Sequence, residues 1–134
     1  MRRILPLIAL LLAGCGAQPK PAPAPQRTAA QAEAAAVAES FVRAVGRHDW
    51  TAACATRSYD DLLALAREAG TCERALTLAF KGKDVALLAR TVAGPIRVEG
   101  DKAGIDMVQR GAKRTVLRLF AVREEGHWRL QDVT

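Results

Sequence analysis

The feature that most constrains the fold of this chain is a change in hydrophobic periodicity near Thr91. Before Thr91, apolar residues recur every three or four positions, which is the spacing of one face of an α-helix. After Thr91, apolar and polar residues alternate, as they do in a strand with one buried face. A run of helices followed by hairpin-linked strands predicts an α+β domain, with helices packed on a curved antiparallel sheet of about four strands.

Five helices are expected between residues 28 and 89, and each begins at a residue that can cap it. Thr28 and Gln31 have the spacing of a capping box, and Gly46 is expected to end the first helix. The other caps are expected at Asp49, Ser58, Thr71 and Asp84. The inner side of the third helix is expected to consist of Leu62, Leu63, Leu65 and Ala66.

The four strands are expected near residues 96–99, 103–107, 115–122 and 127–133. Ala103, Ile105 and Met107 alternate with polar neighbours and are expected in the core. The same alternation places Asp106 on the opposite face of the sheet.

The third expected strand is apolar on both faces apart from Arg118, as expected of a central strand. We expect the open face of the sheet to carry Val116, Phe120 and Val122. Such a face is suited to burial against a second copy of the chain, so a homodimer through the sheet face is one expected assembly.

The first fifteen residues have the layout of a secretory signal. Residues 1–3 carry positive charge, residues 4–12 are apolar, and small residues then lead to Cys15. The apolar run is about half of the ~20 residues that a membrane-spanning helix needs. A cleaved export signal is therefore expected in place of a permanent transmembrane helix.

Residues 12–15, Leu-Ala-Gly-Cys, resemble the lipobox at which bacterial lipoprotein precursors are lipidated and cleaved. The resemblance implies that residues 1–14 are removed and that Cys15 carries fatty acyl chains such as palmitate. Two or three such chains anchor a protein stably. The domain would then be exported and held by lipid on the cell membrane or the outer membrane. The alternative is an ordinary signal peptide in which Cys15 is incidental.

Residues 15–27 form the expected tether between the lipid and a domain that spans residues 28–134. Proline alternates with alanine and lysine in the tether, which favours an extended spacer over a helix or a strand. A proline-rich ligand for a recognition domain is the alternative.

The basic charge of the chain belongs largely to its N-terminal part. Four of the twenty lysines and arginines precede the domain, which leaves sixteen basic residues against fourteen acidic ones. The two signs are interspersed, without a basic helix or interleaved aromatic residues, so no nucleic-acid partner is expected. Roughly a hundred residues remain to fold, enough for one modest core.

If Cys15 carries lipid, Cys54 and Cys72 are left as an even pair in an oxidising compartment. We expect a disulfide between them that joins the second and fourth helices. Two free buried thiols, or a pair of metal ligands, are the alternatives. No histidine or further cysteine lies at ligand spacing near them, so no metal site is expected.

The order of elements and several segments resemble the nuclear transport factor two-like (cystatin-like) superfamily, a cone-shaped α+β fold. The matching segments are residues 41–44, 49–54, 98–103 and 125–130. The superfamily contains ketosteroid isomerases and many exported bacterial domains without an assigned role. Its small exported lipoproteins commonly carry a pair of cysteines such as Cys54 and Cys72. The resemblance implies a fold more than a function, because this fold carries enzymes and binding proteins alike.

No catalytic residues and no cofactor are predicted. Isomerases of the superfamily use an aspartate base with a tyrosine and a protonated aspartate, and the candidates here are Tyr59, Asp60, Asp61 and Asp106. The first three fall in the first turn of a helix, where carboxylates are favourable for the helix itself. Asp106 is expected to pair across strands with Arg97, Arg118 or Arg129. Tyr59 and Asp106 are nevertheless the candidate polar residues that would line a cone.

These patterns favour a non-catalytic module at the cell envelope. Such a module would bind a small apolar ligand in its cone, or another envelope protein. A small isomerase- or cyclase-like enzyme that uses acids in the cone is one alternative. A purely structural spacer at the membrane is the other.

Overall fold

The structure, a computed structural model, describes Gly16 and residues 26–133 of the 134-residue chain, without the side chains of residues 132 and 133. The expected signal, the expected lipidation site Cys15 and most of the expected tether lie outside the described residues. Among the helices of the described part, none is long and apolar enough to cross a membrane.

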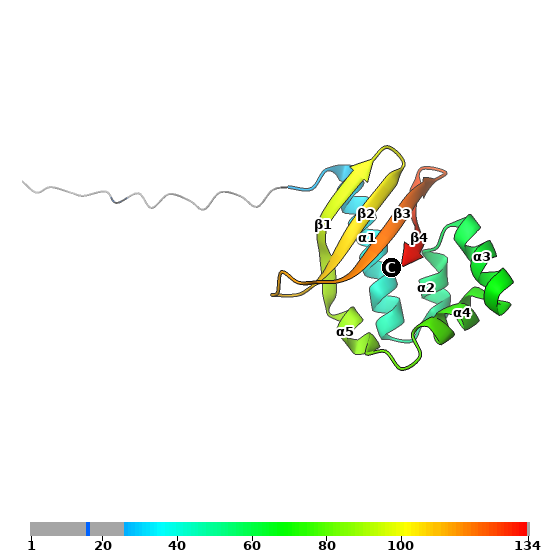
Figure 1. The fold of residues 1–134 in the computed structure, drawn as a ribbon. Coiled ribbons are helices and arrows are strands. Elements are labelled where there is room, and N and C mark those ends of the chain that lie inside the picture. The colour runs from blue at the N-terminus through cyan, green and yellow to red at the C-terminus, as the bar shows by residue number, and fades with distance from the viewer. Residues whose placement is uncertain (1–15, 17–25, 134) are drawn as a thin grey trace, which may run out of the picture.

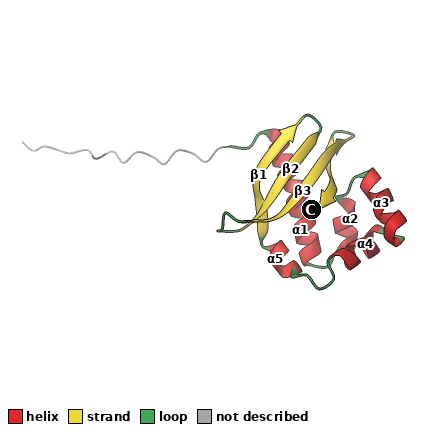
Figure 2. Ribbon diagram, viewed as in Figure 1, coloured by secondary structure: helices red, strands yellow, loops and turns green. Residues whose placement is uncertain are grey.

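Within residues 26–133, helices come first and strands follow (Figures 1 and 2). The helices are α1 (Ala29–Gly46), α2 (Trp50–Ala55), α3 (Tyr59–Ala69), α4 (Cys72–Ala79) and α5 (Val85–Ala89). The strands are β1 (Thr91–Glu99), β2 (Lys102–Gln109), β3 (Thr115–Glu124) and β4 (His127–Val133). The change of period near Thr91 therefore marks the boundary between the two halves, and the predicted α+β class is confirmed.

Each helix begins at the predicted cap. Thr28 and Gln31 form a capping box, in which the Gln31 N–H donates to Thr28 Oγ1 and the Thr28 N–H donates to Gln31 Oε1. The caps of the later helices are Asp49, Ser58, Thr71 and Asp84. The side chain of each accepts a hydrogen bond from the backbone N–H of the residue three positions later in the chain. Local side-chain chemistry thus determines where the helices start.

The four strands form an antiparallel meander in the order β1-β2-β3-β4, so β3 is an interior strand, as predicted. Ala103, Ile105 and Met107 of β2 are buried, and Ile105 pairs with the buried Leu119 of β3. One face of the sheet therefore forms the floor of the core, and α1 lies across that face (Figure 1).

Small residues let α1 approach its neighbours closely. Ala34 and Ala38 are fully buried beneath the sheet, and Phe41 fills the centre of the core. At the end of α1, a Cβ on Gly46 would clash with the Cβ of Ala89 in α5. Glycine at this position thus permits the α1–α5 contact.

The α3–α4 hairpin (residues 59–79) lies to one side of the sheet, beyond β4 (Figure 1). The chain reaches it through residues 56–58, which run beside β4. The Ser58 N–H donates to the Leu130 carbonyl at 2.7 Å, and the Leu130 N–H donates to the Thr56 carbonyl at 2.8 Å. These two bonds fix the point from which α3 departs.

Two predicted side-chain positions are wrong. Leu63 was expected to face the core and is 38% exposed, because the inner face of α3 is set by Asp61 and Leu65, one turn apart. Val116 was expected on the open sheet face and instead lines a cleft. Leu117 pairs with Met107 while Thr115 pairs with Val108, so Val116 is an extra residue in a β-bulge.

Candidate ligand-binding cleft

A cleft of about 430 Å³ opens between the α3–α4 hairpin, α5 and the start of β3. Its volume is within the range of sites that hold small molecules. Eight of its twelve lining residues are apolar, which makes it an apolar site: Leu65, Ala75, Leu76, Ala79, Phe80, Leu88, Val116 and Leu117. The charged lining residues are Arg57, Asp61, Lys83 and Asp84.

The apolar wall is supported by packed aromatic rings. Phe80, the C-cap of α4, is buried and stacks on Trp50 of α2, with 6.2 Å between ring centroids. The ring of Phe41 in α1 lies 6.3 Å from it on another side. The cleft surface formed by Phe80 is therefore continuous with the main core, and its shape does not depend on the hairpin alone.

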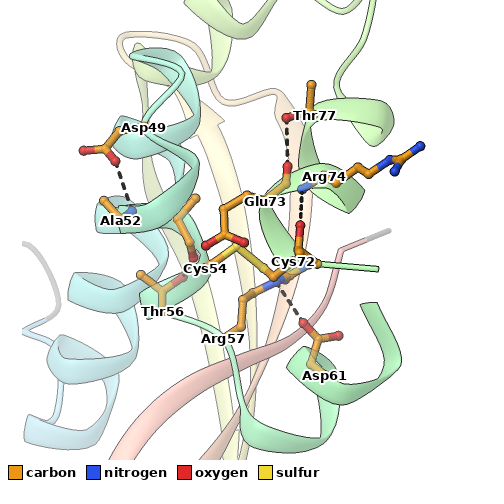
Figure 3. Close-up of a disulfide and its surroundings, with 12 residues drawn as sticks. Asp49, Ala52, Cys54, Thr56, Arg57, Asp61, Cys72, Glu73, Arg74 and Thr77 are labelled. Carbon is orange, nitrogen blue, oxygen red and sulfur yellow. Dashed lines mark hydrogen bonds and ion pairs between the residues drawn. A yellow bond between two sulfur atoms is a disulfide. The ribbon is translucent and has the colours of Figure 1, made fainter. Parts of the chain in front are cut away.

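An ion pair between Arg57 and Asp61 forms the polar part of the deep lining. Arg57 Nε lies 2.9 Å from Asp61 Oδ2, and the two side chains are only 5% and 9% exposed. Figure 3 shows Arg57 directed toward Asp61 at the start of α3. The guanidinium also lies over the Phe41 ring, 5.1 Å from its centroid. Removal of one partner from a pair this buried strongly destabilises the fold, because the remaining buried charge loses this ion pair.

Two further charges lie at the exposed rim of the cleft. Lys83 Nζ lies 5.7 Å from the centroid of the Phe80 ring. Asp84 caps α5 and accepts the Leu87 N–H at 3.2 Å. The cleft thus carries two positive and two negative groups, and its formal charge sums to zero.

The predicted Cys54–Cys72 disulfide is confirmed. It joins α2 to the first turn of α4, with 6.1 Å between the two Cα atoms (Figure 3). Since α4 contributes Ala75, Leu76 and Ala79 to the cleft lining and its C-cap is Phe80, the disulfide fastens one wall of the cleft to the body of the domain.

Tyr59 and Asp106, predicted to line a cone, are not among the lining residues of this cleft. Tyr59 is 66% exposed, and its backbone N–H donates to the Glu124 carboxylate. Asp106 lies on the outer face of the sheet, because the buried Ile105 and Met107 on either side of it point the other way.

Asp106 makes the cross-strand pair that the sequence predicts, with Arg118 as its partner. Arg118 Nε donates to Asp106 Oδ1 at 2.6 Å, and Nη2 lies 3.3 Å from Oδ2. This hydrogen bonding holds the pKa of Asp106 below its ordinary value, and the charges of Arg118 and Arg97 act in the same direction. Asp106 is therefore part of a surface ion pair.

Sequence reasoning missed Arg57 and assigned Asp61 only to the start of a helix. Asp61 does occupy the first turn of α3, where its N–H donates to the capping Ser58. The available signal was the spacing of four between Arg57 and Asp61, which allows an ion pair. That spacing usually marks an exposed helical pair, and here the packing of residues 56–58 on β4 buries it.

Within residues 26–133, no group of three or more histidine, cysteine, aspartate or glutamate side chains could hold a metal ion. His48 and His127 are both exposed. The cleft combines apolar surface with the buried Arg57–Asp61 ion pair.

Comparison of the chain with protein-family models, with curated proteins and with solved structures gives no match. The geometry and chemistry of the cleft are therefore the basis on which a function can be inferred.

Proposed function

We propose that this chain is an exported bacterial lipoprotein whose domain binds a small apolar ligand without chemical conversion. The observation that carries the proposal is the apolar cleft of about 430 Å³, lined by eight apolar residues and enclosing a buried ion pair. Pockets that bind small molecules have this character, with a largely apolar lining and a few placed polar groups.

Binding without catalysis is favoured because the charged lining groups already have structural roles. Asp61 forms an ion pair with Arg57, with 2.9 Å between Oδ2 and Nε, and Asp84 caps α5. A general acid or base needs to reach a substrate proton with a pKa suited to transfer. Neither carboxylate is placed for such a role, since each is engaged by a neighbouring group of the protein.

The proposed location rests on residues 12–15 and the proline-rich stretch after them. In Figure 1 the described chain enters at one end of α1, and α4 and α5 lie near the other end. A tether at that position would leave the cleft accessible from the side away from the attachment point. Such an arrangement suits a domain that captures a ligand outside the cytoplasm. The outline of the nuclear transport factor two-like superfamily is part of the same proposal.

Ligand binding can be tested with the chain that starts at Gly16, since residues 26–133 contain all the described helices and strands. N-phenyl-1-naphthylamine, a neutral apolar fluorophore, is the probe. We expect saturable binding that Ala79→Trp weakens at least about tenfold by filling the cleft. The matched control is Ala64→Trp, on an exposed α3 position outside the lining. Equal binding by both variants would place the probe elsewhere and refute the proposal.

Anchoring can be tested in the full chain by metabolic labelling with an alkyne fatty acid. We expect the label in the wild-type protein and none in the Cys15→Ser variant, because Cys15 is the proposed acceptor. Unchanged labelling of the variant would show that Cys15 is not the lipidated residue.

A second proposal concerns the open face of the sheet, where Phe120 is 40% exposed. Phe120 lies opposite Gly104 of β2 and lines a pocket together with Arg97, Glu99 and Arg118, so a partly apolar patch with charged neighbours lies on this face. We propose that this face self-associates. Sedimentation equilibrium of the chain from Gly16 should show a dimer that Phe120→Lys dissociates, and a monomeric wild-type protein at high concentration would exclude it.

A further inference from the structure

The charges inside the cleft indicate which ligands it accepts, provided that the proposed ligand-binding function holds. The two charged groups in the deep lining, Arg57 and Asp61, neutralise each other at 2.9 Å. The other two, Lys83 and Asp84, are exposed at the rim. The deep part of the cleft thus combines an apolar wall with a dipolar, net-neutral pair.

A charged ligand group would be unfavourable in this deep part. It would lose its hydration on entering an apolar site, and ions are costly to bury without a counter-charge. An anionic group could approach Arg57 only in competition with Asp61, whose buried carboxylate would then lose its ion pair with Arg57. A cationic group would compete with Arg57 for Asp61 in the same way.

A neutral polar group meets no such penalty. A hydroxyl, ester or amide can hydrogen-bond to an ion pair while the pair stays intact, and hydrogen bonds to charged groups are stronger than those between neutral groups. The apolar body of the same ligand would contact Leu76, Phe80 and Leu88, which are buried in the cleft wall.

We propose that the cleft selects uncharged amphiphiles, and that the Arg57–Asp61 pair is the specificity-determining element. The ligand class is an aliphatic or aromatic body with one neutral hydrogen-bonding end, such as an alcohol, an ester or an amide. Fatty acids and alkylamines are disfavoured, although their apolar bodies are the same.

Three ligands that share a ten-carbon chain test the selection: decan-1-ol, decanoate and decylammonium. Each is titrated at neutral pH against the bound N-phenyl-1-naphthylamine. We expect decan-1-ol to displace the probe most strongly. For the protein, the ratio of the decan-1-ol affinity to the affinity of either ion should be at least about tenfold larger than the same ratio for partition into neutral phosphatidylcholine vesicles. A preference no larger than that of the vesicles overturns the inference.

The same titrations separate this inference from the proposed function. Absence of saturable probe binding to the wild-type protein refutes ligand binding itself. Probe binding that decan-1-ol cannot displace, or that decanoate displaces as well as decan-1-ol, refutes only the selection of neutral ligands.

Variants test whether the ion pair is the cause. Asp61→Asn keeps the shape of the side chain and leaves the Arg57 charge, so the ratio of decanoate to decan-1-ol affinity should rise at least about tenfold. Asp60→Asn, on an exposed neighbouring position, is the matched control and should leave the ratio unchanged. An unchanged ratio in folded Asp61→Asn protein, checked by circular dichroism, would assign the selection to another group.

A second variant covers the case in which Asp61→Asn does not fold. In the double variant Arg57→Met, Asp61→Leu, apolar side chains replace the pair, a type of exchange that is often neutral or stabilising. We expect its affinity for decan-1-ol, relative to its affinity for N-phenyl-1-naphthylamine, to fall at least about tenfold, because the hydroxyl loses its partner. An unchanged ratio of the two affinities would overturn the role of the pair.

Discussion

The layer formed by α1 and the sheet differs from the α3–α4 hairpin in what holds its side chains in place. In the first region, large apolar side chains such as Phe41, Ile105 and Leu119 are fully buried. In the hairpin, the one buried residue of α3 is Asp61, and the buried residues of α4 are Cys72, Ala75 and Leu76. A disulfide and a buried ion pair take over much of the attachment there.

This difference is related to the position of the cleft. A helix whose inner face were filled with leucines packed on the sheet would leave no space for a ligand. The hairpin is instead fixed at the start of each of its helices: α3 by residues 56–58 beside β4, and α4 by the Cys54–Cys72 bridge to α2. A wall held in this way can stay in place while the space beside it remains open.

The largest expected effect comes from the core beneath the sheet. Ile105→Ala removes a fully buried side chain and should lower the free energy of unfolding by about 2–5 kcal/mol, from lost burial and a cavity. Urea denaturation measures the change. The contrasting variant is Leu63→Ala in the hairpin, where the side chain is 38% exposed and the loss should stay below about 1 kcal/mol. Equal losses would contradict the contrast between the two regions.

Removal of the disulfide should have a slightly smaller effect, concentrated in the hairpin. The bridge closes a loop with a sequence separation of 18, and the double variant Cys54→Ala, Cys72→Ala should lose about 3 kcal/mol on the chain-entropy estimate. Hydrogen exchange should accelerate in α3 and α4 while β2 and β3 stay protected, because the sheet core does not depend on the bridge. Uniform acceleration throughout the domain would show that the hairpin and the sheet unfold as one unit.

A third change tests the close contact between α1 and α5, which carries the cleft residue Leu88. Gly46→Ala places a Cβ against that of Ala89 and should cost about 1–3 kcal/mol by overpacking. The double variant Gly46→Ala, Ala89→Gly relieves the clash and should recover most of the loss in thermal or urea unfolding, apart from the cost of the new glycine in α5. Failure of the second substitution to restore stability would assign the loss to something other than this contact.

The sequence predicts the local structure of this domain well, because caps and periodicity act over a few residues. Thr28, Ser58 and Thr71 form the expected caps, and the class of fold follows from the change of period near Thr91. The disulfide was predicted from the even pair, Cys54 and Cys72, that is left if Cys15 carries lipid. These features require no knowledge of which surfaces meet.

The cleft was not predictable in the same way, because it depends on how the hairpin is placed against the sheet. The spacing of Arg57 and Asp61 fits an exposed helical pair as well as a buried one. The pair is buried through tertiary contacts, which include those of residues 56–58 with β4 and of Arg57 with the Phe41 ring. Val116 reaches the cleft because of a β-bulge. An alternating pattern cannot reveal a bulge, since one extra residue changes the face of each residue after it.

The smallest expected effect concerns the Asp106–Arg118 pair, an exposed ion pair that contrasts with the buried Arg57–Asp61 pair. Arg118 lowers the pKa of Asp106 in the folded protein. The pair therefore stabilises the fold at a pH above the ordinary carboxyl pKa of about 4. This stabilisation is lost as the pH falls through the lowered pKa of Asp106 in the folded protein. Exposed ion pairs contribute little. Asp106→Asn should therefore change the melting temperature at pH 7 by less than roughly 2 °C, and the difference from the wild type should shrink on acidification as the wild-type carboxylate is protonated. Calorimetry between pH 7 and pH 3 measures both effects. A difference that grows as the pH falls would show that the sign of the linkage is wrong, and that Asp106 is stabilised in its protonated form.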